Sequence, residues 1–268
     1  MPSAAALRIE IERALDRRFP AALTPVPRTI SETATTGVLE VDALLDGGLP
    51  VGAISELTGP QSSGRTGLAL SFLAQQTQDE RVCAWVDAGD AFDPESAAAS
   101  GVILRQLLWV RCRDVSTVNA KNGSRISPGW KAKTGAPVWT RLDQALRATD
   151  LLLQAGGFAA IVLDLGEMAR EQGSRIPLAT WFRFRQTADR TRCCLVVLGQ
   201  AAYAQSSAAV VLECAPCKPH TAGGTVLNGF SFEVRRGRQR FAPGLQGARK
   251  PPASTWSATS AWEEEERA

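Results

Sequence analysis

The chain of 268 residues lacks a signal peptide and lacks any apolar stretch long enough to cross a membrane. We therefore expect a cytoplasmic protein with no membrane partner, whose cysteines stay reduced. The formal net charge of +3 is too small to indicate a dedicated nucleic-acid binder. No internal repeat is visible, and a hydrophobic content of 44% is sufficient to bury one large α/β core.

Histidine is scarce, since the chain has a single one, and this limits the metal chemistry that the sequence can support. Cys214, Cys217 and His220 have the spacing of zinc ligands, but a structural zinc site needs a fourth ligand and none lies nearby in the sequence. We therefore expect no zinc. The cysteines in apolar runs are expected to be small core residues: Cys83, Cys193 and Cys194.

One segment has the sequence of a phosphate-binding loop except at one position, where Arg65 replaces the usual lysine. In such loops, backbone N–H groups turn inward and hold a polyphosphate at the N-terminus of the next helix. Thr66 would add its hydroxyl to the ligands of Mg²⁺. A guanidinium keeps the charge of lysine but is planar and broader, so its fit to phosphate differs. The pattern predicts either a nucleotide site or a purely structural turn. The candidate nucleotide-binding residues are Gly59, Pro60, Gln61, Ser62, Ser63, Gly64, Arg65 and Thr66.

Apolar runs around this loop predict a mostly parallel sheet flanked by helices. A strand is expected before the loop and a helix after it, and three later runs end in polar residues. Because ligands bind at the carboxyl ends of strands in open α/β sheets, Asp87, Asp164 and Gln200 should converge on the loop. Asp164 has the position of an acid that holds Mg²⁺. The expected strands are 53–57, 82–87, 159–164 and 193–200, and the expected helix covers 68–75.

Three consecutive signatures resemble the bacterial recombinase RecA: Thr36–Gly52, Gly59–Thr66 and Val86–Pro94. The similarity runs in order from about residue 5 to 242. Shortened loops, the altered phosphate loop and a basic ending at 235–240 are similar, more narrowly, to the ImuA family of RecA-related accessory proteins in damage-induced mutagenesis. The resemblance implies a RecA-like P-loop NTPase core. Its expected parts are an N-terminal helix and linker (1–35), the core (36–242) with a mobile insertion near 114–140, and a flexible, disordered tail (243–268).

The resemblance also implies degraded catalysis. In RecA the acid that activates the attacking water stands two residues after the aspartate matched by Asp87, and here that position is Gly89. Asp90 is a poor substitute, because neighbours on an extended segment point to opposite sides. Ser96 stands where RecA has its adenine-stacking tyrosine. We expect little or no ATPase activity, while binding of ATP with Mg²⁺ stays open. The retained contacts are Thr66 and Asp164 for the metal, with Asp93 and Gln200 for the nucleotide.

Two further features concern partners. Leu7, Ile11 and Leu15 recur every fourth residue as one apolar stripe. The matching RecA helix docks on the neighbouring subunit, so this helix can dock on RecA or on another copy of the chain; the alternative is that it packs on its own core. Arg236 and Arg238 match, loosely, basic residues that RecA presents across its subunit interface.

Direct DNA binding is expected to be weak, because the two segments that match RecA's DNA loops, 167–175 and 201–207, are short. Basic residues elsewhere either bind phosphate backbones or are merely solvated: Arg111, Arg113, Lys121, Arg125, Lys131 and Lys133. The resemblance implies an accessory protein of SOS-induced translesion synthesis that binds RecA, an ImuB-type polymerase-like scaffold, or both. A related reading is that it limits RecA filaments. The alternative is an active DNA-stimulated ATPase of the recombinase type.

Overall fold

The computed structural model describes residues 32–113, 140–222, 226–239 and 252–259. The apolar stripe of Leu7, Ile11 and Leu15 therefore lies outside the described residues, as does the expected insertion except for Thr140. The described residues belong to one compact unit, Glu32–Ala268.

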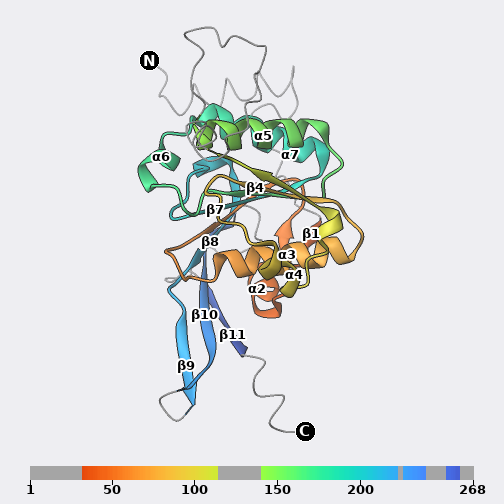
Figure 1. Ribbon diagram of the computed structural model, residues 1–268. Coiled ribbons are helices and arrows are strands. Elements are labelled where there is room, and N and C mark those ends of the chain that lie inside the picture. Colours follow the sequence, from red (N-terminus) through yellow and green to blue (C-terminus); the bar gives the residue numbers. More distant parts are fainter. Residues whose placement is uncertain (1–31, 114–139, 223–225, 240–251, 260–268) are drawn as a thin grey trace, which may run out of the picture. The chain divides into compact units, whose positions relative to one another are not determined.

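The unit is built on one sheet, whose described strands number nine. A parallel set comprises β3 (Ile54–Thr58), β4 (Cys83–Asp87), β5 (Leu107–Arg111), β6 (Ala160–Asp164), β7 (Cys194–Gly199) and β8 (Ala208–Cys214). An antiparallel set comprises β9 (Lys218–Ala222), β10 (Val226–Gln239) and β11 (Ala253–Thr259). The strand order is β11-β10-β8-β3-β7-β6-β4-β5, and β9 pairs with β10 (Figure 1).

Helices cover both faces of the parallel part of the sheet (Figure 1). One face carries α3 (Arg65–Gln78) with two short helices, α2 (Leu39–Leu44) and α4 (Pro94–Ala99). The other face carries α5 (Arg141–Ala155) and α7 (Leu178–Thr191). The remaining elements are β1 (Thr33–Ala34), which pairs with β2 (Leu49–Pro50), and the short helices η1 (Leu104–Gln106), α6 (Arg170–Ser174) and η3 (Gln205–Ser207).

Successive residues of the parallel strands face opposite cores. In β6, Ala160 and Val162 belong to the core under α3, while Ile161 and Leu163 belong to the core under α5 and α7. A strand buried on both faces favours apolar residues, which explains the apolar runs of β4, β6 and β7, whereas β3 also buries the polar residues Ser55, Glu56 and Thr58. The expected fold class, a mostly parallel sheet flanked by helices, is confirmed. So is the burial of Cys83, Cys193 and Cys194.

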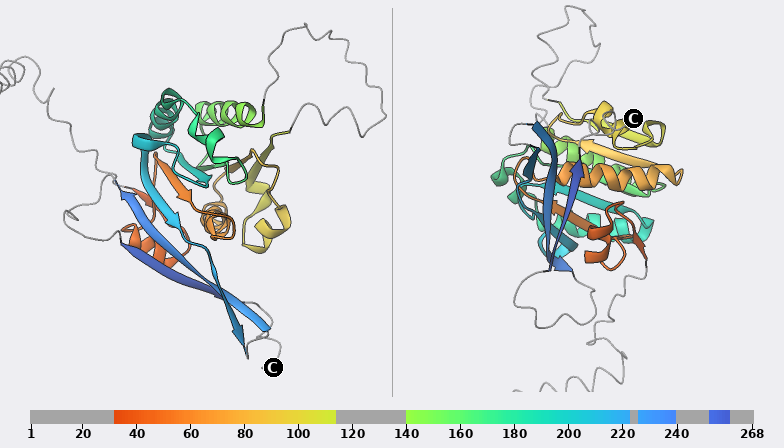
Figure 2. Two further views of the ribbon diagram at one scale, coloured as in Figure 1. Left: turned by 90° about the vertical axis from the view of Figure 1, so that its left-hand side faces the viewer. Right: turned by 90° about the horizontal axis from the view of Figure 1, so that it is seen from below.

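The tail differs from the expectation, because part of it is a strand. β11 pairs along β10 from Gly229↔Thr259 to Arg235↔Ala253. Trp256 stacks on Phe232 with ring centroids 5.3 Å apart and packs against the core under α3. Backbone pairing along the edge of β10 and partial burial of the Trp256 indole outweigh a local composition that favours disorder. The β9–β10–β11 part extends beyond the helices (Figure 2).

None of the helices within the described ranges combines the length and the apolar character needed to span a membrane.

Candidate phosphate-loop site

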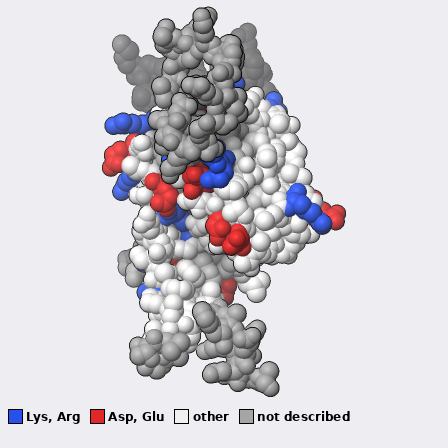
Figure 3. Space-filling view, viewed as in Figure 1, with Lys and Arg blue, Asp and Glu red and all other residues white. Residues whose placement is uncertain are grey.

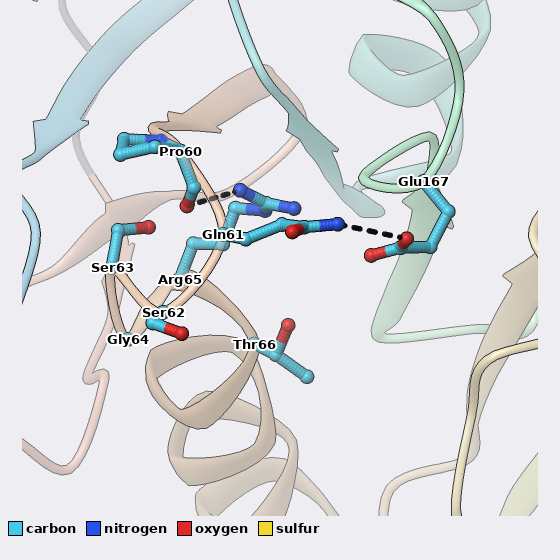
Figure 4. A pocket seen from close by; sticks show the side chains of 8 residues that line it. All are labelled: Pro60, Gln61, Ser62, Ser63, Gly64, Arg65, Thr66 and Glu167. Carbon is cyan, nitrogen blue, oxygen red and sulfur yellow. Dashed lines mark hydrogen bonds between the residues drawn. The ribbon is translucent and has the colours of Figure 1, made fainter.

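The candidate site lies where β3 ends and α3 begins. Gly64 is the N-cap of α3 in the left-handed conformation (φ 79°), and Ser62 also has a positive φ (57°). Such alternation turns successive N–H groups to one side, which forms an anion-binding concavity at the helix N-terminus. A cavity of about 400 Å³ opens there, lined by Pro60, Gln61, Ser62, Ser63, Gly64, Arg65, Thr66 and Glu167 (Figure 4).

Two glycines are fixed in this loop by their neighbours. A Cβ atom at Gly59 would lie 2.4 Å from the carbonyl oxygen of Cys214, and one at Gly64 would lie 2.4 Å from the ring of Phe232. Both distances are far below van der Waals contact, so only glycine fits at either position. The loop is therefore moulded against β8 and β10.

Arg65 does not extend into the cavity as a phosphate-binding lysine would. Its side chain is 6% exposed and turns back onto its own loop. The guanidinium donates to the carbonyl oxygens of Gly59 and Pro60, the latter at 2.6 Å, and to that of Gly166 at 3.1 Å. The planar fork thus joins the phosphate loop to the loop after β6, a task for which one ammonium group has too short a span.

The expected convergence of polar strand ends is seen for two of the three residues. The side-chain amide of Gln200 donates to the carbonyl oxygen of Gly166 at 3.3 Å, beside Arg65. Asp164 accepts from the backbone N–H of Gly166 at 2.8 Å. Burial raises the pKa of Asp164 to about 6. The negative charges of Asp87 and Glu167 act in the same direction, while the hydrogen bond from Gly166 and the charge of Arg65 oppose them.

Asp87 is adjacent to Asp164 in register but has a structural role. Its carboxylate is fully buried and accepts from the backbone N–H groups of Ala91 and Phe92, both at 3.0 Å. It therefore stabilises the turn after β4 and is not among the residues that line the cavity. Its location next to the site was expected, while this turn-holding role was not.

Two other acidic side chains near the strand ends, Asp93 and Asp90, are also engaged in contacts within the protein. Asp93 caps α4 by accepting from the Ser96 hydroxyl and from the backbone N–H groups of Ser96 and Glu95, and these hydrogen bonds lower the pKa of Asp93. Its expected contact with nucleotide stays a prediction. Asp90 is paired with Arg111 at 2.6 Å, and that hydrogen bond lowers the pKa of Asp90.

Comparison with known proteins agrees with the fold and the loop. Residues 5–116 match the RecA N-terminal domain. RecA of Allorhizobium ampelinum (strain ATCC BAA-846 / DSM 112012 / S4) is 36% identical over 154 residues, which are 54% of this chain and 35% of that protein. RecA of Nostoc sp. (strain PCC 7120 / SAG 25.82 / UTEX 2576) is 40% identical over 99 residues, 37% of this chain and 28% of that protein. The chain thus spans about a third of the length of these RecA proteins.

A solved structure shows the same fold. The crystal structure of the RadB recombinase superposes with a TM-score of 0.55 at 16% identity, and the match covers 83% of this chain and 94% of that one. The protein is RecA-like in fold, and its N-terminal sequence is RecA-like as well.

The two segments that were expected to match RecA's DNA loops, 167–175 and 201–207, pack against each other. α6 forms part of the first, and a Cβ at its Gly173 would lie 2.5 Å from the Tyr203 ring of the second. The buried carboxylate of Glu56 accepts from the backbone N–H groups of Tyr203 and Ala204 at 2.6 and 2.9 Å. Both segments are therefore tied to the core. On the face in Figure 3, acidic and basic side chains of the described residues are interspersed and do not form a continuous basic area.

Arg236 was expected to be presented at an interface, and in this structure it makes contacts within its own chain, so the interface role stays a prediction. Its side chain is buried, with 7% exposed, and donates to the carbonyl oxygen of Leu44 at 2.8 Å, with Asp46 3.5 Å away. The end of α2 needs a donor for its free carbonyl groups, and a long arginine on β10 supplies it. Arg238 is exposed and donates to the carbonyl oxygen of Gln205, so its interface role stays a prediction.

Within the described ranges, no group of three or more His, Cys, Asp or Glu side chains is arranged to hold a metal ion. Cys217 uses its backbone N–H, which donates to the carbonyl oxygen of Ser62 at 3.0 Å, and so supports the phosphate loop.

The loop nevertheless fits a nucleotide with Mg²⁺. The Ser63 hydroxyl is buried without a hydrogen-bond partner in the part of the chain that the structure describes, a position suited to a phosphate oxygen. Thr66 is exposed at the start of α3, and Asp164 supplies a carboxylate at the adjacent strand end. These two residues would hold Mg²⁺, which neutralises phosphate charge when bound.

Glu167 was missed as a pocket residue. It lies in the segment that was expected to match a DNA loop, and no local pattern in the sequence marks it as a pocket residue. The structure places its carboxylate 3.3 Å from the side-chain nitrogen of Gln61, across the cavity (Figure 4).

Proposed function

We propose that the protein is a RecA-like accessory protein of the DNA-damage response that acts mainly through its partners, with weak or no ATPase activity. The observation that carries this proposal is the arrangement of Arg65. A cation bonded to three backbone carbonyl groups is not free to stabilise the transferring phosphoryl group, a contribution on which phosphoryl transfer depends.

The proposed partners are RecA and an ImuB-type polymerase-like scaffold, in SOS-induced translesion synthesis. A protomer that has a RecA-like core but an altered nucleotide site can join one end of a RecA filament without continuing its ATPase cycle. Such a protomer would limit filament length. Self-association through the N-terminal segment is part of the same proposal. We expect direct DNA binding to be weak, because the segments around Tyr203 and Gly173 are packed together and are not free to follow a DNA strand.

The test uses the purified full chain with purified RecA and, separately, with an ImuB-type protein. Co-purification in pull-down and a fall in the light scattering of RecA filaments on single-stranded DNA are the expected results. Failure to bind either protein, with filaments unaffected at stoichiometric amounts, would contradict the proposal.

The second candidate function is a DNA-stimulated ATPase of the recombinase type. Asp90 does not support it, since Arg111 holds its carboxylate. The specific observation in its favour is Glu167, a carboxylate on the cavity wall. Phosphate release with and without single-stranded DNA distinguishes the two candidates, because turnover at the rate of an active recombinase would contradict the accessory role.

A further inference from the structure

Glu167 is the only carboxylate among the eight residues that line the cavity at the described phosphate loop. It reaches the cavity from the loop after β6, opposite the start of α3 (Figure 4). A phosphate-loop hydrolase needs a group that orients the attacking water and takes its proton, and a carboxylate within reach of the phosphates is suited to both tasks.

The backbone around Glu167 is held firmly. Leu165 donates its N–H to the carbonyl oxygen of Leu198 at 3.0 Å, and Met168 donates to that of Leu165 at 3.0 Å. The side chains of Leu165 and Met168 are buried on either side, with 0% and 9% exposed. Glu167 is thus the exposed residue of a tight, anchored turn, and Gln61 holds its carboxylate at 3.3 Å. Fixed placement of this kind is what a catalytic side chain requires.

Glu167 also occupies the space beside Gly89. A Cβ atom at position 89 would lie 2.8 Å from the Cβ and 3.1 Å from the Cγ of Glu167. The two positions therefore compete for one volume at the edge of the site, and only one of them can carry a side chain there. The absence of a side chain at position 89 makes room for the carboxylate that enters from position 167.

We propose that Glu167 is the catalytic acid-base residue of this pocket and acts on a nucleoside triphosphate. This inference rests on the proposed nucleotide binding at the loop. The water oxygen bonds to the γ-phosphorus, and the bond from that phosphorus to its bridging oxygen breaks, leaving the electron pair on the diphosphate. The water proton passes to the Glu167 carboxylate and then to solvent. Because Arg65 is engaged elsewhere, this hydrolysis is slow but measurable.

The first experiment needs no nucleotide and tests the competition for space. Gly89→Ala is measured by thermal unfolding in the wild type and in a Glu167→Gly background. We expect the unfolding midpoint to fall by about 3–6 °C in the wild type and by much less in the second background, because the clash is then removed. Equal shifts in the two backgrounds would show that the side chains do not compete.

The second experiment compares the wild type with Glu167→Gln, with the exchange variant Gly89→Glu/Glu167→Gly, and with Glu171→Gln as a control at an exposed acid on α6. Fluorescent ATP and ADP analogues measure affinity in Mg²⁺, and single-turnover phosphate release measures hydrolysis. We expect Glu167→Gln to slow release about 100-fold. It should also tighten ATP relative to ADP about threefold, since a negative charge beside the terminal phosphate is removed. The exchange variant should release phosphate at least about tenfold faster than Glu167→Gln, and the control variant Glu171→Gln should release it at the rate of the wild type.

The outcomes separate this inference from the proposed function. If the wild type binds ATP but Glu167→Gln leaves both phosphate release and the ATP to ADP affinity ratio unchanged, the inference is overturned and nucleotide binding stands. Absence of any release from a wild type that binds ATP also overturns it. If the wild type binds neither nucleotide, the nucleotide site itself is wrong, and the partner-binding role is still decided by the RecA and ImuB assays.

Discussion

We expect Arg65 to stabilise the phosphate loop and, at the same time, to weaken the binding of phosphate by that loop. Substitutions at this position separate the effect on stability from the effect on binding. In Arg65→Ala, the carbonyl groups of Gly59, Pro60 and Gly166 lose a charged donor. A hydrogen bond that involves a charged group contributes about 1.5–3 kcal/mol, but removal of a buried cation returns part of this. We expect a net loss of about 2–4 kcal/mol in the free energy of unfolding.

Arg65→Lys should have effects of opposite sign on stability and binding. An ammonium group can keep one or two of the three carbonyl contacts, so the loss of stability should be about half that of Arg65→Ala. The same ammonium becomes available to a bound polyphosphate, and a gain of about 1.4 kcal/mol would tighten ATP tenfold. A protein that becomes less stable and binds its nucleotide more tightly would show that this position exchanges one role for the other.

Urea unfolding gives the stabilities, and titration of a fluorescent ATP analogue in Mg²⁺ gives the affinities. Arg147→Ala is the matched control, because that arginine is on the surface of α5 with 57% of its side chain exposed and should shift stability by less than about 0.5 kcal/mol. The reasoning is refuted if Arg65→Ala is as stable as the control, or if Arg65→Lys leaves ATP affinity unchanged.

Three more predictions concern the phosphate loop and the adjacent strand end. Gly67→Ala, in α3 with open space around its Cβ, should stabilise the protein by about 1 kcal/mol, whereas Gly64→Ala should cost more than about 1 kcal/mol because of its φ of 79° and the Phe232 ring; urea unfolding of the pair checks the signs. Thr66→Ala should leave stability within about 0.5 kcal/mol of the wild type but weaken MgATP about tenfold in titrations, and equal affinity would argue for a structural turn. The raised pKa of Asp164, about 6 against 3.8, means that its contribution to stability is present below pH 4 and is lost as pH rises through 6. The free energy of unfolding of Asp164→Asn, relative to that of the wild type, should therefore rise by up to about 3 kcal/mol between pH 4 and pH 7. Urea unfolding at several pH values measures both, and the same pH dependence in the two proteins would contradict this prediction.

The parallel part of the fold could be predicted because its signals are local. The strands β4, β6 and β7 are buried on both faces, and this burial favours a continuous apolar run. The run at 159–164 ends at Asp164 in the structure as expected. The phosphate loop is likewise a local pattern of glycines between a strand and a helix. Its neighbours at the strand ends followed from the rule that parallel strands end at one edge of the sheet.

Other features depend on partners that are distant in the sequence. β11 has a polar, small-residue composition, and only the open edge of β10 makes it a strand. Arg236 is buried because Leu44, 192 residues away, presents a free carbonyl group. Glu167 is marked as a pocket residue only by the position of Gln61, 106 residues away, and by the empty space at Gly89. The two members of each pair are too far apart in the sequence for a short stretch of sequence to contain both.

Residues that packing requires and residues that it does not require differ in what they indicate about nucleotide binding at the loop. Gly59 and Gly64 are required by the Cys214 carbonyl group and the Phe232 ring, whether or not a phosphate is present. Their presence is thus equally expected for a structural turn and for a binding site. Packing imposes no such requirement on the exposed hydroxyl of Thr66, and burial makes the charge of Asp164 costly to the fold. A residue that is dispensable for stability, or unfavourable to it, is the informative one, so the question of nucleotide binding is settled at Thr66 and Asp164 and not at the glycines.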